Sequence, residues 1–300
     1  MRAGLGEKSL VAYRVSLPHG CWRGQDGDPP VREVTIRAVD EQDDPFLIDT
    51  ADVRPGARGT ALIARCLVDE PEPADFAGSL TVGDREALLL HLRRLTLGDR
   101  IDVRVRCPAR ACREQMDVSL AVDSLLTPQY EDVRQEYDFG VEVQGSHHEV
   151  RFRLPTAADL EPTRSSSGVE VDRQAREILA CCLVRATMDG VPERANELPD
   201  EVHEAVGAEM LRRDPQAELE LDLKCPACGA EFAIVLDTAT LVLRELDERA
   251  VRLMHEIHVL ASRYHWSERS ILRIPARRRA QYIELLFAET TRAAREATAW

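Results

Sequence analysis

Two pairs of cysteines in this 300-residue chain have the spacing of metal-binding turns. The first pair is Cys107 and Cys112, and the second is Cys225 and Cys228. A turn with two thiolates supplies half of a closed tetrahedral shell, and structural zinc is often held by four cysteines at about 2.3 Å. The sequence therefore predicts one structural Zn²⁺ with Cys107, Cys112, Cys225 and Cys228 as its ligands.

The segments on both sides of each pair alternate apolar and polar residues. This period of two is typical of half-buried strands. It occurs in residues 101–106 and 115–120 around the first pair, and in residues 219–224 and 231–236 around the second. We expect two β-hairpins that together form a zinc-ribbon-like pair.

Other uses of the cysteines remain open at this stage. Reduced cysteines are common as small buried hydrophobes, and a C-x-x-C turn can also be a redox motif. A disulfide is disfavoured, because disulfides persist mainly in secreted proteins. The chain begins without the charged region followed by an apolar region that a secretory signal would require. His147 and His148 are the nearest alternative ligands, although loop histidines are usually solvated.

The remaining four cysteines have no ligand-like spacing. We expect Cys66, Cys181 and Cys182 to be core residues of helical segments, because leucine and valine follow them. Cys21 lies in a polar stretch that we interpret as a loop, and its role is left open.

A shift of 116 positions aligns the two halves of the chain. It places residues 34–37 on 150–153, residues 62–68 on 178–184, and Cys112 on Cys228. In the first half a helix is bounded by a capping box that begins at Thr81 and by Gly98, and its counterpart lies within residues 201–213. The chain is therefore predicted to be a tandem duplication of one α+β unit.

After the second hairpin the hydrophobic period changes to 3.6. Apolar residues from Leu246 to Ala261 form one stripe on a predicted helix that reaches about Tyr264. Ser267 is placed to cap a short second helix, and Pro275 to begin a third. The fold class is thus α+β, with lobes at 1–126 and 127–238 joined by the zinc hairpins, followed by a helical appendage at 239–300.

Charge limits the function classes. The chain has 53 acidic and 39 basic residues, for a net charge of −14, whereas binding to nucleic acid phosphates requires a basic face. The arginines at 273 and 277–279 form only a small patch, which a solvated helix turn would explain. The acidic run at 40–44 is interpreted as a polar turn that caps a helix.

The sequence also gives no sign of catalysis or of membrane insertion. No apolar run approaches the roughly 18 residues of a membrane span, and we find no phosphate-binding loop, nucleophile elbow or H-E-x-x-H motif. We expect a soluble, cytoplasmic protein that is not an enzyme.

Several motifs are similar to those of a known family. Ser16–Gly20, Asp40-Glu41, Val82-Gly-Asp-Arg85, the leucine run after it, Gly98-Asp99 and Cys107-Pro108 follow one another. This order resembles the phage T4-type baseplate protein family, whose members include the baseplate hub assembly chaperone. The resemblance covers about residues 16–120 and continues more weakly to residue 237. The histidine at position 19 and the longer Cys107–Cys112 turn depart from the family pattern.

The resemblance implies a role in building the baseplate of a contractile tail or injection particle, with baseplate, hub or spike proteins as partners. The alternative is a zinc-ribbon regulator or nucleic-acid adaptor, which the acidic charge disfavours. The Tyr264–Glu268 segment has no role assigned from the sequence.

Overall fold

The computed structural model describes residues 11–23, 28–160 and 171–297. The chain divides into two compact units, of which unit 1 comprises residues 1–39 and 53–242, and unit 2 comprises residues 40–52 and 243–300. Within the described residues, every helix is too short or too polar to span a bilayer.

The first half of unit 1 begins with two antiparallel strands and continues with helices. These elements are β1 (Ala12–Cys21), β2 (Val31–Arg37), α2 (Pro55–Cys66), α3 (Pro73–Ser79) and α4 (Val82–Leu97). Residues 83–93 of α4 are all buried. Because α4 is enclosed on all sides, it forms the centre of this half rather than an amphipathic cover. The predicted helix ends are confirmed, since the Thr81 side chain accepts a hydrogen bond from Asp84 N and Gly98 ends the helix with φ +97°.

The second half of unit 1 contains a four-stranded antiparallel sheet in the order β5-β6-β7-β8. Its strands are β5 (Tyr137–Val143), β6 (Ser146–Phe152), β7 (Leu183–Met188) and β8 (Val191–Glu193), and its helices are α6 (Val171–Cys182) and α7 (Asp200–Arg213). One face of the sheet forms a core with these helices, in which Phe152, Val202 and Val206 are fully buried. The other face carries exposed polar side chains.

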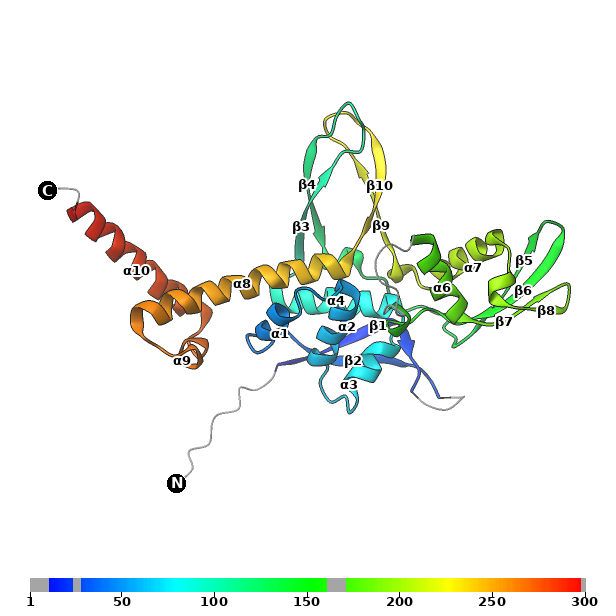
Figure 1. Ribbon diagram of the computed structural model, residues 1–300, viewed down its shortest axis with the longest axis horizontal. Coiled ribbons are helices and arrows are strands. Elements are labelled where there is room, and N and C mark those ends of the chain that lie inside the picture. Colours follow the sequence, from blue (N-terminus) through cyan, green and yellow to red (C-terminus); the bar gives the residue numbers. More distant parts are fainter. Residues whose placement is uncertain (1–10, 24–27, 161–170, 298–300) are drawn as a thin grey trace, which may run out of the picture. The chain divides into compact units, whose positions relative to one another are not determined.

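Each half of unit 1 ends in a β-hairpin. The first pairs β3 (Arg100–Arg106) with β4 (Gln115–Ala121) and leads into α5 (Val122–Leu125); the second pairs β9 (Leu219–Lys224) with β10 (Glu231–Leu236). The predicted strands are therefore confirmed, with limits that match those of β9 and β10. Figure 1 shows the two hairpins side by side, with their tips together.

Matching contacts recur at the 116-residue spacing. The Arg37 guanidinium donates to the carbonyl oxygen of Arg65 at 3.0 Å, and 116 residues later Arg153 donates to the carbonyl oxygen of Cys181 at 3.2 Å. Helices α2 and α6 begin and end 116 residues apart. Backbone pairing follows the same shift, since Ile36 pairs with Leu67 in the first half and Phe152 pairs with Leu183 in the second.

Unit 2 consists of helices and of a short segment from early in the chain. It contains α1 (Asp44–Asp49), the part of α8 (Thr238–Tyr264) from Leu243 onward, α9 (Glu268–Leu272) and α10 (Ala276–Ala297). Its core includes Leu260 and Ile271, against which stacked Tyr264 and Trp266 pack. The Ser267 cap on α9 is confirmed by a hydrogen bond from Ser270 N.

Ionic contacts attach residues 40–52 to the helices of unit 2. Arg249 pairs with the buried carboxylate of Asp44, and Arg279 donates to Glu41 at 2.7 Å and to Glu256 at 2.8 Å. The polar turn expected at 40–44 is present as residues 41–43, which lead into α1, where Asp44 is about 3% exposed. The solvated arginine patch expected from the sequence is wrong at Arg279, which is also about 3% exposed. The division of the chain at residues 126 and 238 stays a prediction.

Candidate metal centre

The two hairpins of unit 1 bring four thiols to one place. Cys107 follows the last paired residue of β3, and Cys225 follows the last paired residue of β9. The apolar faces of the hairpins belong to one hydrophobic cluster, to which Val103 and Leu120 contribute from the first hairpin and Leu219, Leu221 and Leu236 from the second. Packing of these faces aligns the tips, where the cysteines lie.

The sulfur positions suit a tetrahedral metal ion. The Sγ atoms of Cys107 and Cys228 are 3.7 Å apart, and those of Cys112 and Cys225 are 3.8 Å apart. All four lie within 4.8 Å of one another, and in the described residues they are the group that could hold a metal ion. Four ligands at about 2.3 Å in a tetrahedron would place their sulfurs about 3.8 Å apart, which the Cys107–Cys228 and Cys112–Cys225 separations match.

The turns between the cysteines point backbone N–H groups at sulfur. The N–H groups of Cys228 and Ala227 bond to Cys225 and, despite some desolvation, hold the pKa of its thiol at about 7. Hydrogen bonds from the backbone favour a thiolate, which is the form that binds metal. Backbone hydrogen bonds also reach Cys107 and Cys112, but burial and the neighbouring thiols outweigh them and raise the pKa of Cys107 to about 12 and the pKa of Cys112 as well. A cation that binds sulfur would offset this mutual effect of the four thiols.

The longer first turn closes in the same way as the second. Cys107 N donates to Glu114 O at 2.9 Å, and Cys225 N donates to Ala230 O at 2.9 Å. The residue after each second cysteine has a positive φ, which is +52° at Arg113 and +75° at Gly229. The two extra residues between Cys107 and Cys112 are thus accommodated within the turn and do not displace the sulfurs.

The alternative histidines lie elsewhere. His147 and His148 are on strand β6 and not in a loop, so the expectation of solvated loop histidines is wrong for His148, which is 1% exposed. The His148 ring lies 3.4 Å from a Glu193 carboxylate oxygen, and His147 is bonded to Glu142 at 2.8 Å. Neither contributes to the cysteine cluster.

The expectations for the other cysteines hold only in part. Cys66 and Cys182 are buried, as core residues should be, but Cys181 is exposed. Cys21 is the last residue of β1 and is buried, with its sulfur 3.1 Å from Ser79 Oγ. The polar residues that follow it had suggested a loop, whereas its own side chain faces the interior.

Sequence reasoning missed a buried polar junction in unit 1. The Asp84 carboxylate accepts hydrogen bonds from the backbone N–H groups of His19 at 2.9 Å and Gly20 at 2.8 Å. The Asp214 carboxylate accepts bonds from Gly83 N and from the Tyr130 hydroxyl, each at 2.9 Å. Burial raises the pKa of Asp84 to about 7 and raises the pKa of Asp214 as well. The capping box gave a local signal for Asp84 but none for these distant partners.

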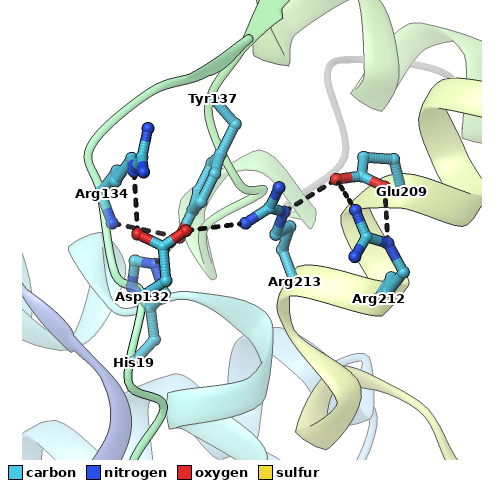
Figure 2. A network of polar contacts seen from close by, with 7 residues as sticks. All are labelled: His19, Asp132, Arg134, Tyr137, Glu209, Arg212 and Arg213. Atoms are coloured by element: carbon cyan, nitrogen blue, oxygen red, sulfur yellow. Dashed lines mark hydrogen bonds and ion pairs between the residues drawn. The ribbon is translucent and has the colours of Figure 1, made fainter. Parts of the chain in front are cut away.

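A second set of polar contacts extends from this junction along α7 (Figure 2). The Tyr137 hydroxyl lies 2.9 Å from His19 Nε2, and the Arg213 guanidinium lies over the Tyr137 ring at 4.9 Å from its centre. Arg213 also bonds Glu209 at 2.8 Å and Asp132 at 3.1 Å. The network therefore fixes α7 to β1, β5 and the segment before β5.

One comparison with known proteins, that with protein families, agrees with the motif resemblance. Searches of curated proteins and of solved structures found no match. A family model described as T4 bacteriophage base plate protein matches residues 60–241, which include all four clustered cysteines and the whole of α4. Because this match covers more than half of the chain, the protein belongs to the T4 bacteriophage base plate protein family.

Proposed function

We propose that this protein is a non-catalytic assembly or structural component of a contractile-tail or injection-system baseplate, and that it acts by binding other proteins. The observation that carries this proposal is the family match over residues 60–241, which supports a structural or assembly role in a phage baseplate. The proposed partners are other baseplate components, including hub or spike proteins. The proposed location is the cytoplasm, where thiols stay reduced and available to a metal.

The proposed cofactor is one structural Zn²⁺ held by Cys107, Cys112, Cys225 and Cys228. The sulfur separations of 3.7 and 3.8 Å and the backbone N–H groups at Cys225 support it. Zinc prefers tetrahedral thiolate shells in structural sites, and its binding free energy adds to that of folding. When bound, the ion would fasten together two hairpins from distant parts of the chain.

The proposed architecture is a tandem duplication in which each half supplies two metal ligands. The repeated arginine contacts and strand pairings at a spacing of 116 residues support it. The zinc hairpins are then equivalent parts of two repeats. A shared metal would keep the repeats in one arrangement and so preserve a single binding surface.

A binding role also accounts for the buried carboxylates. Asp84 and Asp214 are each bonded to backbone N–H groups, so their hydrogen bonds serve to position the chain. Buried networks whose members are satisfied rigidify a fold and specify one arrangement.

The test is deletion of the gene in its host, followed by electron microscopy of sheathed particles and identification of proteins that co-purify with the tagged chain. We expect defective baseplates and recovery of baseplate, hub or spike proteins. Complementation with the double variant Cys225→Ser, Cys228→Ser should fail, whereas Cys181→Ser, at an exposed cysteine outside the cluster, should succeed. Normal particles together with recovery of nucleic acid would instead support the regulator or adaptor.

A further inference from the structure

The two edges of the four-stranded sheet in unit 1 differ in how they are protected. Strand β8 has three residues and contains Pro192. Strand β5 has seven residues, pairs with β6 without a register shift, and contains neither proline nor lysine. Proteins usually protect sheet edges with short strands, proline, bulges or charged side chains, of which lysine is the most common. The β8 edge has two of these protections, whereas the β5 edge has only the acidic side chains of Asp138 and Glu142 and is otherwise open to further pairing.

The turn between β5 and β6 identifies which backbone groups point outward. Gln144 and Gly145 both have positive φ, +53° and +87°, as in a two-residue type I′ turn. Such a turn makes Val143 and Ser146 a hydrogen-bonded pair, and bonded pairs then alternate along the strands. The N–H and C=O groups of the alternate residues Asp138, Gly140 and Glu142 therefore face away from β6. Among the described residues no backbone hydrogen bond reaches them.

A hollow adjoins this edge on the exposed face of the sheet. It has a volume of about 370 Å³ and is lined by residues that include Gly140, His147, Arg151 and Arg185. A Cβ atom on Gly140 would make a tight contact of 3.2 Å with His147 Cε1, so glycine leaves room for the His147 ring beside the strand, at the wall of the hollow. Bulky side chains on a neighbouring strand often cover such a glycine.

A second copy of the chain is a poor occupant for the open edge. In the antiparallel register that pairs all seven residues of β5 with themselves, Asp138 would lie opposite Glu142 of the other copy. Both carboxylates are accessible, with side chains 70% and 69% exposed. Like charges directly opposite each other destabilise a strand pair, whereas a basic residue at either position would be attracted.

We propose that the open edge of β5 binds an extended segment of another baseplate protein, which adds a fifth antiparallel strand. The backbone of Asp138, Gly140 and Glu142 supplies the hydrogen bonds, as in other cases of strand addition. Basic residues of the partner lie opposite Asp138 and Glu142, and a bulky residue opposite Gly140 fills the hollow. This inference rests on the proposed function for the identity of the partner.

Photo-crosslinking in the assembling host tests the proposal. A photoreactive residue is placed at position 138 or 142 of the tagged full-length chain, and at Val191, which is 64% exposed on the β8 edge, as the control. Positions 138 and 142 should crosslink to one short segment of one baseplate protein, and position 191 should not. Because the added strand is antiparallel, the partner residue that crosslinks to position 138 should lie C-terminal to the one that crosslinks to position 142. Crosslinks to a second copy, to this chain's own residues, or to no protein would overturn the proposal.

Two variants test the mechanism of binding. Gly140→Pro removes an outward N–H without removing a bond to β6. Gly140→Leu fills the hollow and leaves the backbone in place, because its tight neighbour, 3.2 Å from the Cβ position, is the His147 side chain, whose ring can shift slightly. Each should reduce the crosslinking yield at least tenfold, while circular dichroism and the thermal midpoint of the free protein stay as in the wild type. Undiminished crosslinking by a folded Gly140→Leu chain would refute the role of the hollow. Recovery of baseplate proteins without crosslinks from positions 138 and 142 would refute this surface but not the proposed function.

Discussion

Gly83 should tolerate no side chain, because its neighbour across the junction of unit 1 is a buried carboxylate. A Cβ atom at position 83 would lie 1.9 Å from Asp214 Oδ1, far inside any normal contact. Asp214 is 2% exposed and accepts bonds from Gly83 N and the Tyr130 hydroxyl. In Gly83→Ala the carboxylate must move away and leave both of these donors.

The cost follows from the two lost hydrogen bonds. Each hydrogen bond to a charged group contributes roughly 1.5–3 kcal/mol, so their loss amounts to about 3–6 kcal/mol. Alanine in place of glycine stabilises a helix by about 1 kcal/mol, which offsets part of this loss. We therefore expect Gly83→Ala to lower the free energy of unfolding of unit 1 by about 2–5 kcal/mol, measured by urea denaturation followed by circular dichroism.

A matched control and a second background isolate the cause. Gly207 lies in the middle of α7, and a Cβ atom there meets nothing within 4 Å, so Gly207→Ala should raise stability by about 0.5–1 kcal/mol. In an Asp214→Ala background, Gly83→Ala should be neutral or stabilising. An unchanged unfolding midpoint for Gly83→Ala alone, or an equal loss in both backgrounds, would refute the reasoning.

Three further predictions concern the metal centre and the buried junction. Removal of metal by a chelator, or Cys225→Ser, should lower the thermal midpoint of unit 1 by several degrees, because a structural site contributes to folding. Either change should also abolish the thiolate-to-metal absorption of the cobalt-substituted protein. Full stability without metal would contradict this prediction. Burial raises the pKa of Asp84 to about 7. The stability that this group contributes is therefore complete below about pH 4 and is lost as pH rises through about 7. Asp84→Asn should flatten the dependence of unfolding free energy on pH in that window by up to about 1.4 kcal/mol per pH unit, and an unchanged slope would count against this explanation. Because Arg113 has a φ of +52°, Arg113→Gly should raise the free energy of unfolding by up to about 1 kcal/mol in denaturation experiments. Gly229→Val, at φ +75°, should lower it by at least as much. A lower free energy of unfolding for Arg113→Gly would show that the Arg113 side chain matters more than its backbone conformation.

The sequence by itself determined the local elements of this protein. Alternation of apolar and polar residues identified the strands of both cysteine hairpins, and Thr81, Gly98 and Ser267 marked helix ends that the structure confirms. These signals are reliable because they depend on residues two to four positions apart, whose geometry a strand or helix fixes. Paired cysteine spacing predicted the cluster for a similar reason, since each turn carries its own two sulfurs.

Only the tertiary structure decided which distant segments meet. Asp84 reaches backbone groups more than sixty residues earlier, and Asp214 reaches Gly83 across 131 positions. Residues 40–52 belong with the C-terminal helices, because Arg249 and Arg279 pair with their carboxylates. A buried charge needs a partner, but which partner it finds depends on how the elements pack. No local pattern contains that information, so the sequence predicted a polar turn at 40–44 without its partners Arg249 and Arg279, and the junction at Asp84 was missed.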